Sequence, residues 1–479
     1  MPVLLRTHAQ ACAPVMCPRA CARVLVCTRE RLDPVCAHLC LSMCASVPVY
    51  LHLCILVPMF VSVPVSAVCS PELDVYVMPS RTDRQHIQGV WFPQGRCSQL
   101  SNPWQHCDQH KVPQHELQSL ASSLTQFGLE AFHIIARYNR DANVLISPVS
   151  LAAALTHLLL GARNNSKHDL ETALFYQPDV PCVHETLAKV LRQAPSLLSV
   201  SQLFYKKDLQ LKQTFMEDSQ RLYGIKPMSL STNMSENVRN INSWITKHTG
   251  GKITTLVNHV TADTELLLLN AVFYKGTWKT RFRKEDRREE FFSVSPDKMV
   301  TVPMLHHASY PLAAIFHEGL NAKIAKFQMF GRSSLIVMVP GDISRTVQEL
   351  EQELTLPNLR AALTQLQGTQ LKPTSVLLPA LQLRNSQDLI QPFNDMGLQD
   401  VLVQPNLCGM SAYPVEVSGA EHQAALTLDE EGVEAAAITA LSVARNVVMF
   451  EVQQPYLVIL WNDELGYPLF IGRVMDPSQ

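Results

Sequence analysis

A run of small residues near the C-terminus limits how this chain can fold more than any other feature. Residues 432–444 contain no proline and few large side chains, and alanine occupies positions 435–437. Alanine is the best helix former, and Arg445 would end such a helix where the helix dipole favours a cation. Every second residue over 433–443 would, however, line one buried face of a β-strand. The local pattern favours the helix and leaves the strand open.

The segments on either side of this run shift the balance towards the strand. Glu430 and Glu431 precede it, and the sequences FEVQQPYL at 450–457 and PLFIGRVMDP at 468–477 follow it. This combination resembles the serpins, in which a glutamate-rich hinge, a glycine and a run of alanines open a reactive-centre loop. We therefore expect the run to enter a β-sheet at some point in the protein's activity.

The resemblance begins at about Leu117 and reaches the C-terminus. It implies that residues 113–479 form a serpin domain with an α+β fold. In that fold, helices pack around a large central β-sheet plus smaller sheets, and an exposed reactive-centre loop lies at about 430–449. The polar residues 70–112 contain several prolines, and we expect an irregular tether without a core there.

Residues 1–69 are rich in cysteine and valine, and no charged residue occurs between Asp33 and Glu72. A signal-like apolar segment at 51–63 is one interpretation, with small residues for cleavage at 65–67. A transmembrane span is a second, which three prolines disfavour. The third is a gene-model artefact, because Val/Cys alternation is what translated GT repeats would give.

The resemblance implies a secreted suicide inhibitor of serine proteases. In the serpins, a protease cleaves the loop, and the hinge then inserts into the central sheet and traps the acyl-enzyme. The scissile bond would be Arg445–Asn446, because a trypsin-like protease selects a long cation for its acidic pocket. Counting from Glu430 by the general family rule places the bond after Asn446 instead. The sequence SVAR at 442–445 favours Arg445, because it matches shorter-loop members that regulate complement and contact-system proteases.

Two alternatives stay open at this site. Arg445 could be an ordinary solvated arginine, and the chain could be a non-inhibitory serpin that acts as a carrier or chaperone. Non-inhibitory relatives tend to carry proline or charged residues where this chain has alanines, so the hinge favours inhibition. The predicted hinge residues are Glu430, Glu431, Gly432, Val433, Glu434, Ala435, Ala436 and Ala437.

Composition and motifs argue against several other functions. The sequence has no G-x-S-x-G, H-E-x-x-H, P-loop or glycine-rich dinucleotide motif, so we expect neither an enzyme nor a cofactor or metal site. Lys plus Arg (40) nearly equals Asp plus Glu (42), so net charge indicates no nucleic-acid or membrane partner. The expected partners are trypsin-like serine proteases.

The cysteines indicate an oxidising compartment. Nine of the thirteen lie in residues 1–69, and the other four are Cys97, Cys107, Cys182 and Cys408. Four cysteines in a long globular region suit two disulfides, with three connectivities open. The resemblance implies the pairs Cys97–Cys408 and Cys107–Cys182. Sequons at Asn164 and Asn233 agree with a secreted, plasma glycoprotein.

Local patterns predict the elements of the domain. Helical periodicity is clear over 117–135, and an apolar helix is expected over 151–160. An apolar run over 265–274 reads as a buried strand. In serpins, the corner formed by Ser147, Pro148 and Ser150 would lie beneath the central sheet, in the region called the shutter. Ordinary N-capping is the simpler interpretation of these serines and is expected as well.

A basic run is the last candidate site. Acidic residues interrupt it from position 285 onwards, so a solvated surface is the simpler interpretation. The alternative is a site for a heparin-like glycosaminoglycan, as in several serpins. Its candidate residues are Lys275, Lys279, Arg281, Arg283 and Lys284.

Overall fold

The computed structural model describes residues 102–107, 110–194, 197–342, 344–431 and 448–479, together with the backbone of four short strands between residues 21 and 66. The chain divides into two units, 1–92 and 93–479. In the first unit, β1 (Cys21–Thr28) pairs with β2 (Val35–Ser42) and β3 (Pro48–Tyr50) pairs with β4 (Pro64–Ser66), both antiparallel. The apolar segment predicted at 51–63 lies outside the described residues. No helix in the described part has the length and apolar character needed to cross a membrane.

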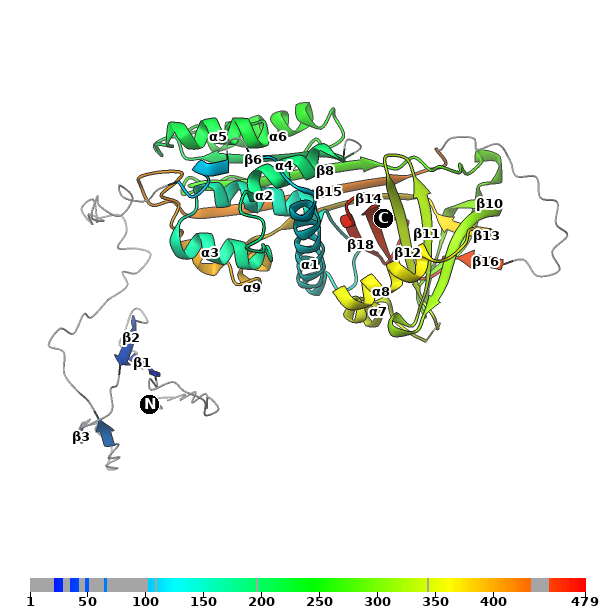
Figure 1. The fold of residues 1–479 in the computed structure, drawn as a ribbon, viewed down its shortest axis with the longest axis horizontal. Coiled ribbons are helices and arrows are strands. Elements are labelled where there is room, and N and C mark those ends of the chain that lie inside the picture. Colours follow the sequence, from blue (N-terminus) through cyan, green and yellow to red (C-terminus); the bar gives the residue numbers. More distant parts are fainter. Residues whose placement is uncertain are drawn as a thin grey trace. The chain divides into compact units, whose positions relative to one another are not determined.

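The second unit is an α+β domain in which helices concentrate before residue 250 and strands after it (Figure 1). The helices predicted over 117–135 and 151–160 lie within α1 and α2. The helices are α1 (Gln114–Tyr138), α2 (Pro148–Gly161), α3 (Asn164–Ala173), α4 (Val183–Arg192), α5 (Gln213–Tyr223), α6 (Met234–His248), α7 (Val347–Glu353), α8 (Leu356–Gln367), α9 (Ile390–Asp395) and α10 (Gln399–Val403), with 3-10 turns η2 (Gln105–Cys107), η3 (Lys284–Asp286) and η4 (Glu318–Leu320).

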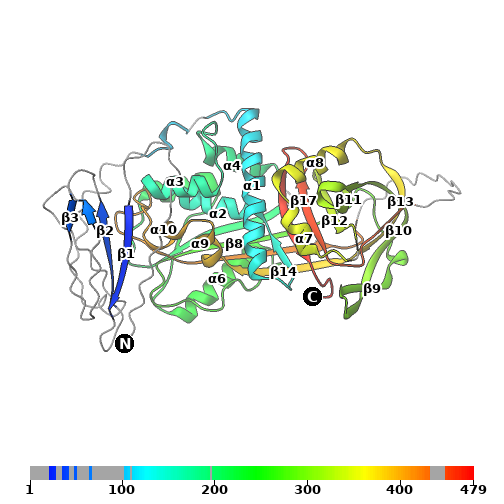
Figure 2. The same ribbon diagram turned by 90° about the horizontal axis from the view of Figure 1, so that it is seen from below.

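Two sheets organise this domain (Figures 1 and 2). The sheet that we call the central sheet has the order β14-β15-β8-β6-β7, formed by β6 (Leu197–Tyr205), β7 (Met228–Ser229), β8 (Leu266–Lys275), β14 (Leu381–Asp388) and β15 (Val417–Leu428). The nine-stranded sheet has the order β16-β13-β10-β11-β12-β17-β18-β5, with β9 also paired to β10. Its strands are β5 (Val144–Ile146), β9 (Arg288–Ser295), β10 (Lys298–His317), β11 (Ala322–Met329), β12 (Ser333–Pro340), β13 (Lys372–Pro379), β16 (Val448–Glu451), β17 (Tyr456–Asn462) and β18 (Tyr467–Val474).

Strand β8 shows why the apolar run at 265–274 was recognisable as a strand. Its alternate residues Leu267, Leu269 and Ala271 pack with Ile241 and Ile245 of α6 in one apolar cluster. The residues between them face the main core, where α2 packs against β6 and β8. Successive side chains of a strand point to opposite faces, and here both faces are covered. The central sheet therefore lies between α6 and α2.

Helix α2 is buried along its whole length, which accounts for its lack of a polar side. Helix α1 passes close to Pro148, the first residue of α2, at Gly128. A Cβ atom at Gly128 would approach the ring carbons of Pro148 to 2.7 Å, so only glycine permits this contact. The corner that contains Ser147 is thus fixed between α1 and the sheets.

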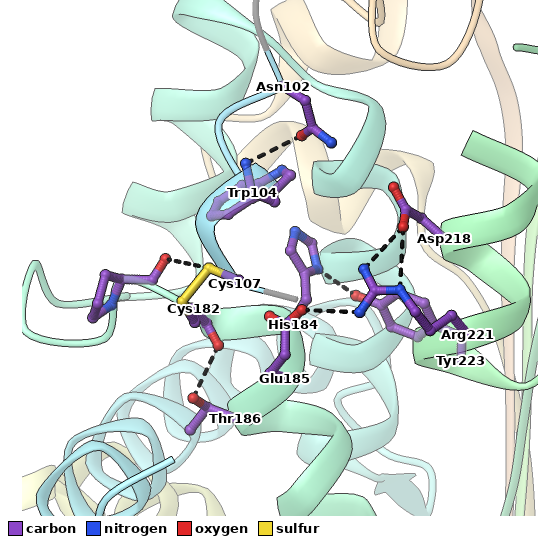
Figure 3. A network of polar contacts seen from close by, with 11 residues as sticks. Asn102, Trp104, Cys107, Cys182, His184, Glu185, Thr186, Asp218, Arg221 and Tyr223 are labelled. Atoms are coloured by element: carbon purple, nitrogen blue, oxygen red, sulfur yellow. Dashed lines mark hydrogen bonds and ion pairs between the residues drawn. A yellow bond between two sulfur atoms is a disulfide. The ribbon is translucent and has the colours of Figure 1, made fainter. Parts of the chain in front are cut away.

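The end of the segment that we expected to be a tether without a core is packed on the helices. Trp104 is buried and lies edge-on to His184 of α4, with ring centroids 4.4 Å apart (Figure 3). The disulfide Cys107–Cys182 joins η2 to the residue before α4. Cys408 is also disulfide-bonded, while Cys97 lies outside the described residues. The packed core therefore begins before residue 113.

A carboxylate pair lies within the central sheet. Glu421 of β15 stands directly opposite Asp388 of β14 in their antiparallel pairing, and next to Leu269 of β8. Burial first, and the charge of Asp388 second, raise the pKa of Glu421 to about 7. The ordinary value of 4.5 applies when the chain is unfolded. Ionisation of Glu421 therefore costs more in the folded protein than in the unfolded chain.

This difference makes a pH-dependent contribution to stability. Stability from Glu421 is fully present below pH 4.5 and is lost as the pH rises through about 7. We expect Glu421→Gln to raise the midpoint of thermal unfolding at pH 7.5 and to have a smaller effect at pH 5.5. Thermal unfolding of both proteins at the two pH values measures this difference. An equal effect of Glu421→Gln at both values would contradict it.

Candidate functional site

The boundary between β15 and β8, which we call the seam, is the centre of the candidate site. The two strands run parallel, in a register from Val417 opposite Leu266 to Thr427 opposite Lys275 (Figure 1). Strand β15 ends at Leu428, so the predicted hinge follows it almost directly. A chain that reversed direction after β15 and entered the seam would lie antiparallel to both neighbours. One parallel pair would become two antiparallel pairs, which are slightly more stable per residue.

Backbone contacts hold the start of the hinge at the end of β8. The indole Nε1 of buried Trp278 donates to the carbonyl oxygen of Asp429 at 2.6 Å. The backbone N–H of Trp278 donates to the carbonyl oxygen of Glu431, and that of Gly276 donates to the carbonyl oxygen of Thr427, both at 3.0 Å. The seam is thus closed at this end by groups just beyond both strands.

Ion pairs add to this closure. The Nζ atom of Lys275 lies 2.6 Å from a carboxylate oxygen of Glu431 and 3.3 Å from one of Asp429. The hydrogen bond to Glu431 is the main cause that raises the pKa of Lys275. Glu430 is 8% exposed and pairs with Arg287 at 2.9 Å. The first two predicted hinge residues are therefore both held by cations, Glu431 by Lys275 at the end of β8 and Glu430 by Arg287 in the segment that follows β8.

The basic run lies beside these contacts. A cavity of about 480 Å³ is lined by Thr277, Arg281, Phe282, Arg283, Lys284, Glu285, Glu430 and Glu431. Carboxylates of Glu285 and of the hinge therefore lie among the cations of this cavity. Lys275 is already engaged by two carboxylates, and Lys279 is exposed. The surface is mixed in charge, and glycosaminoglycan binding stays a prediction.

A buried hydrogen bond crosses the middle of the seam. His422 of β15 lies in register with Asn270 of β8, and its Nδ1 is 2.7 Å from the Oδ1 of Asn270. The other ring nitrogen accepts from the backbone N–H of Ser147 at 3.2 Å. Burial lowers the pKa of His422 to about 3. The ring is therefore neutral, with Nδ1–H as donor and Nε2 as acceptor.

The side-chain amide of Asn270 extends this network to other elements. Its nitrogen donates to the hydroxyl of Ser201 on β6 at 2.6 Å and to that of Ser150 on α2 at 2.7 Å. The Ser150 hydroxyl also lies 2.6 Å from that of Ser199. A polar network beneath the seam thus joins β15, β8, β6 and α2.

The predicted shutter residues reach this network in different ways. Ser147 is the residue before α2, and Pro148 is the first residue of the helix. The N-capping hydrogen bond expected of Ser147 is absent, and its hydroxyl has no partner in the described part of the chain. Its backbone N–H binds His422 instead. The prediction of capping by Ser147 was wrong: its hydroxyl accepts no N–H of the first turn of α2, and the corner is anchored instead through the backbone N–H of Ser147.

Sequence reasoning missed both Asn270 and His422. The available signal was Asn270 itself, a single amide in the otherwise apolar run Leu266–Tyr274. A buried polar side chain in such a strand requires hydrogen-bond partners. Their identity depends on strand order, because His422 is distant in sequence.

The remaining predicted residues of the loop lie outside the described part of the chain. These are Gly432 to Ala437, Arg445 and Asn446; the described structure ends at Glu431 and resumes at Val448. The asparagines of both sequons, Asn164 and Asn233, are exposed, whereas Ser166 is buried. Asn233 precedes α6, and its Oδ1 accepts from the N–H of Glu236 at 3.1 Å, so its amide nitrogen is the atom left for a glycan.

Comparison with known proteins agrees with this architecture. The chain matches the family described as "Serpin (serine protease inhibitor)" over residues 122–477. It is 37% identical to the plasma protease C1 inhibitor of Homo sapiens over 75% of this chain and 71% of that protein. It is 36% identical to the factor XIIa inhibitor of Bos taurus over 75% of each, and 33% identical to the alpha-2-antiplasmin of Mus musculus over 76% of this chain and 73% of that one.

Solved structures show the same fold. The mouse protein-Z dependent protease inhibitor superposes with a TM-score of 0.70 at 24% identity, over 76% of this chain and 100% of that one. Human kallistatin gives the same TM-score and identity over 76% of this chain and 99% of that one. With a family match over most of its length and relatives above 30% identity, the chain belongs to the serpin family.

Proposed function

We propose that this serpin is a secreted inhibitor of trypsin-like serine proteases that is cleaved after Arg445. The observation that carries the proposal is the arrangement of the seam. A proline-free run of small residues, 432–444, follows β15 almost directly, and β15 is parallel to the neighbour from which it would have to separate. The disulfide Cys107–Cys182 supports secretion, because such bonds persist in oxidising compartments.

The chemistry begins with the target protease. Its serine oxygen attacks the carbonyl carbon of Arg445, its histidine takes the serine proton, and the same histidine gives that proton to the leaving amine of Asn446. An acyl-enzyme then links the protease to Arg445. Insertion of residues 432–444 into the seam carries the protease away before water hydrolyses the ester.

Insertion of the cut loop into the seam is expected to lower the free energy of the protein. If each added ladder hydrogen bond contributes about 1 kcal/mol net, a dozen residues contribute on the order of 10 kcal/mol. Before cleavage, the hinge contacts of Trp278 and Lys275 and the His422–Asn270 bond keep the seam closed. The intact protein is then trapped kinetically in a less stable state.

The relatives indicate which proteases to test. The names of the similar proteins refer to C1, factor XIIa and plasmin, so we infer targets in complement, contact and fibrinolytic systems. A carrier or chaperone function would require no insertion. The alanines at 435–437 favour inhibition over that alternative.

The first test concerns Arg445. We expect Arg445→Ala to slow the formation of SDS-stable complexes with trypsin at least about 100-fold, because the acidic pocket of the protease loses its cation. Arg445→Lys is the control and should retain complexes. Association rates measured by gel densitometry decide the matter. Complexes that form at the parent rate with Arg445→Ala would place the scissile bond elsewhere.

The second test separates insertion from simple blocking of the protease. Ala435 belongs to the alternation predicted to face the interior after insertion, and Glu434 to the opposite face. Ala435→Glu would bury an unpaired carboxylate, which costs several kcal/mol and slows insertion. The variant should become a substrate, with cleaved loop exceeding complex, while Glu434→Ala behaves like the parent. The ratio of cleaved loop to complex is the measurement, and an unchanged ratio for Ala435→Glu would argue against this register or against insertion.

The third test concerns the bond across the seam. His422→Ala leaves Asn270 without one partner, so we expect the intact protein to lose about 1–3 kcal/mol of stability. Protein cleaved in the loop should lose less, because insertion separates these strands in any case. Ser201→Ala is the control, since Ser201 binds Asn270 from β6 and not across the seam. Urea unfolding of intact and cleaved forms gives the comparison, and equal losses for His422→Ala in both forms would contradict the role of this bond.

A further inference from the structure

One of the two sequons is interlocked with a distant part of the chain. Asn164 is exposed and is the first residue of α3 (Figure 1), whereas Ser166, which completes the motif, is only 5% exposed. The hydroxyl oxygen of Ser166 accepts a hydrogen bond from the backbone N–H of Asn406 at 2.8 Å. The hydroxyl that defines the motif is therefore covered by a residue 240 positions later in the sequence.

Two further backbone hydrogen bonds hold the same segments together. The N–H of Arg163 donates to the carbonyl oxygen of Asn406 at 2.8 Å, and the N–H of Gly409 donates to that of Gly161 at 2.9 Å. Each segment thus satisfies backbone groups of the other. We call the two segments that these bonds join, residues 161–166 and 406–409, the clasp.

The clasp also packs too closely for a larger residue at position 409. A Cβ atom at Gly409 would lie 2.5 Å from three atoms of the Arg163 guanidinium group. This group is buried, and its Nη1 atom donates to the carbonyl oxygens of Leu160 and Ala162 at 3.1 and 2.7 Å. The guanidinium group could move aside only by giving up these bonds. Glycine at position 409 therefore allows the second segment to dock.

The folded structure can carry a glycan on Asn164 but hinders its attachment. The φ angle of Asn164 is 49°, in the left-handed region that asparagine adopts more readily than most residues. Within the described part of the chain its side-chain amide makes no hydrogen bond, so a glycan on Nδ2 leaves the clasp intact. Attachment is different, because the acceptor motif includes the hydroxyl of the third residue. That hydroxyl belongs to Ser166, which the clasp buries.

We propose that Asn164 is an N-glycosylation site that is modified only before the clasp forms, while the chain is being synthesised. The inference rests on secretion, which is part of the proposed function. The donor is a lipid-linked oligosaccharide diphosphate. The Nδ2 atom of Asn164 forms a bond to the anomeric carbon of the first sugar, and the bond from that carbon to the diphosphate oxygen breaks. The amide proton passes to a base of the transferase, and the lipid diphosphate leaves.

Chain length sets the time available for this modification. Asn406 follows Ser166 by 240 residues, and synthesis adds about 5–20 residues per second, so about 12–48 s pass before Asn406 is made. The second sequon provides a contrast within the same chain. Its hydroxyl belongs to Ser235, which is exposed in the first turn of α6. Folding therefore covers the hydroxyl of one sequon and leaves that of the other accessible.

The experiment offers the full chain, produced without glycans, to a purified oligosaccharyltransferase and a short lipid-linked oligosaccharide diphosphate. Folded, oxidised protein is compared with the reduced and alkylated chain, and mass spectrometry of peptides measures the modification of each sequon over time. We expect Asn164 to be modified at least about tenfold more slowly in the folded protein, because transfer has to await local opening of the clasp. Asn233 should be slowed less by folding.

Two glycine variants test whether the clasp is the cause. Gly409→Ala places a methyl group against the Arg163 guanidinium, so the folded variant should be modified faster at Asn164 than the parent, with no change at Asn233. Gly368→Ala is the matched control, because a Cβ atom at Gly368 would meet no atom closer than 3.7 Å. This control should match the parent at both sequons. Thermal unfolding verifies that both variants are folded.

The possible outcomes separate this inference from the proposed function. Protein secreted by cultured cells should carry a glycan on Asn164, and secreted protein without one would overturn the inference. Modification of Asn164 at the same rate in folded and unfolded parent would overturn it too, and this comparison does not depend on how Gly409→Ala folds. A folded Gly409→Ala that matches the parent would exclude the clasp as the cause. A chain that cells do not secrete would overturn the secretion that we propose, while the comparison of folded and unfolded parent still decides whether the clasp blocks transfer.

Discussion

The parallel pairing of β15 with β8 is the constraint on which the rest of the structure depends. Strand β8 is covered on both faces, by α6 on one side and α2 on the other, while β15 is contacted by α10 and β5. A parallel pair between otherwise antiparallel neighbours can accept one additional strand of reversed direction without any change in the order of the others. The small residues that follow β15 meet the steric requirement for such a strand. The seam between β15 and β8 can thus accept a strand, and the segment of small residues that could form it begins just after β15.

Closure of the seam depends on a few specific contacts in addition to the ladder. Trp278 and Lys275 hold the residues that leave β15, and His422 and Asn270 meet beneath the middle of the two strands. The buried contacts at both positions require defined partners, because an unpaired polar group in the interior costs free energy. Such contacts favour one arrangement over others without contributing much net stability. The proposed function asks the protein to be stable before cleavage and to rearrange after it, and this kind of interaction suits both requirements.

Local pattern predicted the elements more completely than it predicted their contacts. The helices around 117–135 and 151–160 and the strand at 265–274 were recognisable because each has a hydrophobic period that matches its geometry. The packing of Trp104 could not be recognised in the same way, because a single tryptophan in a polar, proline-containing segment forms no hydrophobic periodicity. The role of Ser147 was misjudged for a related reason. Its position before Pro148 predicted a cap, while the group that binds it, His422, lies 275 residues away.

The sequence by itself determined the family, the small-residue run and the cation that precedes Asn446, because these depend on the order and type of neighbouring residues. Only the tertiary structure decided that β15 and β8 are parallel neighbours, that His422 meets Asn270, and that Glu421 stands opposite Asp388. Strand order brings together residues that are far apart in the chain, and no local rule of propensity or period contains that information.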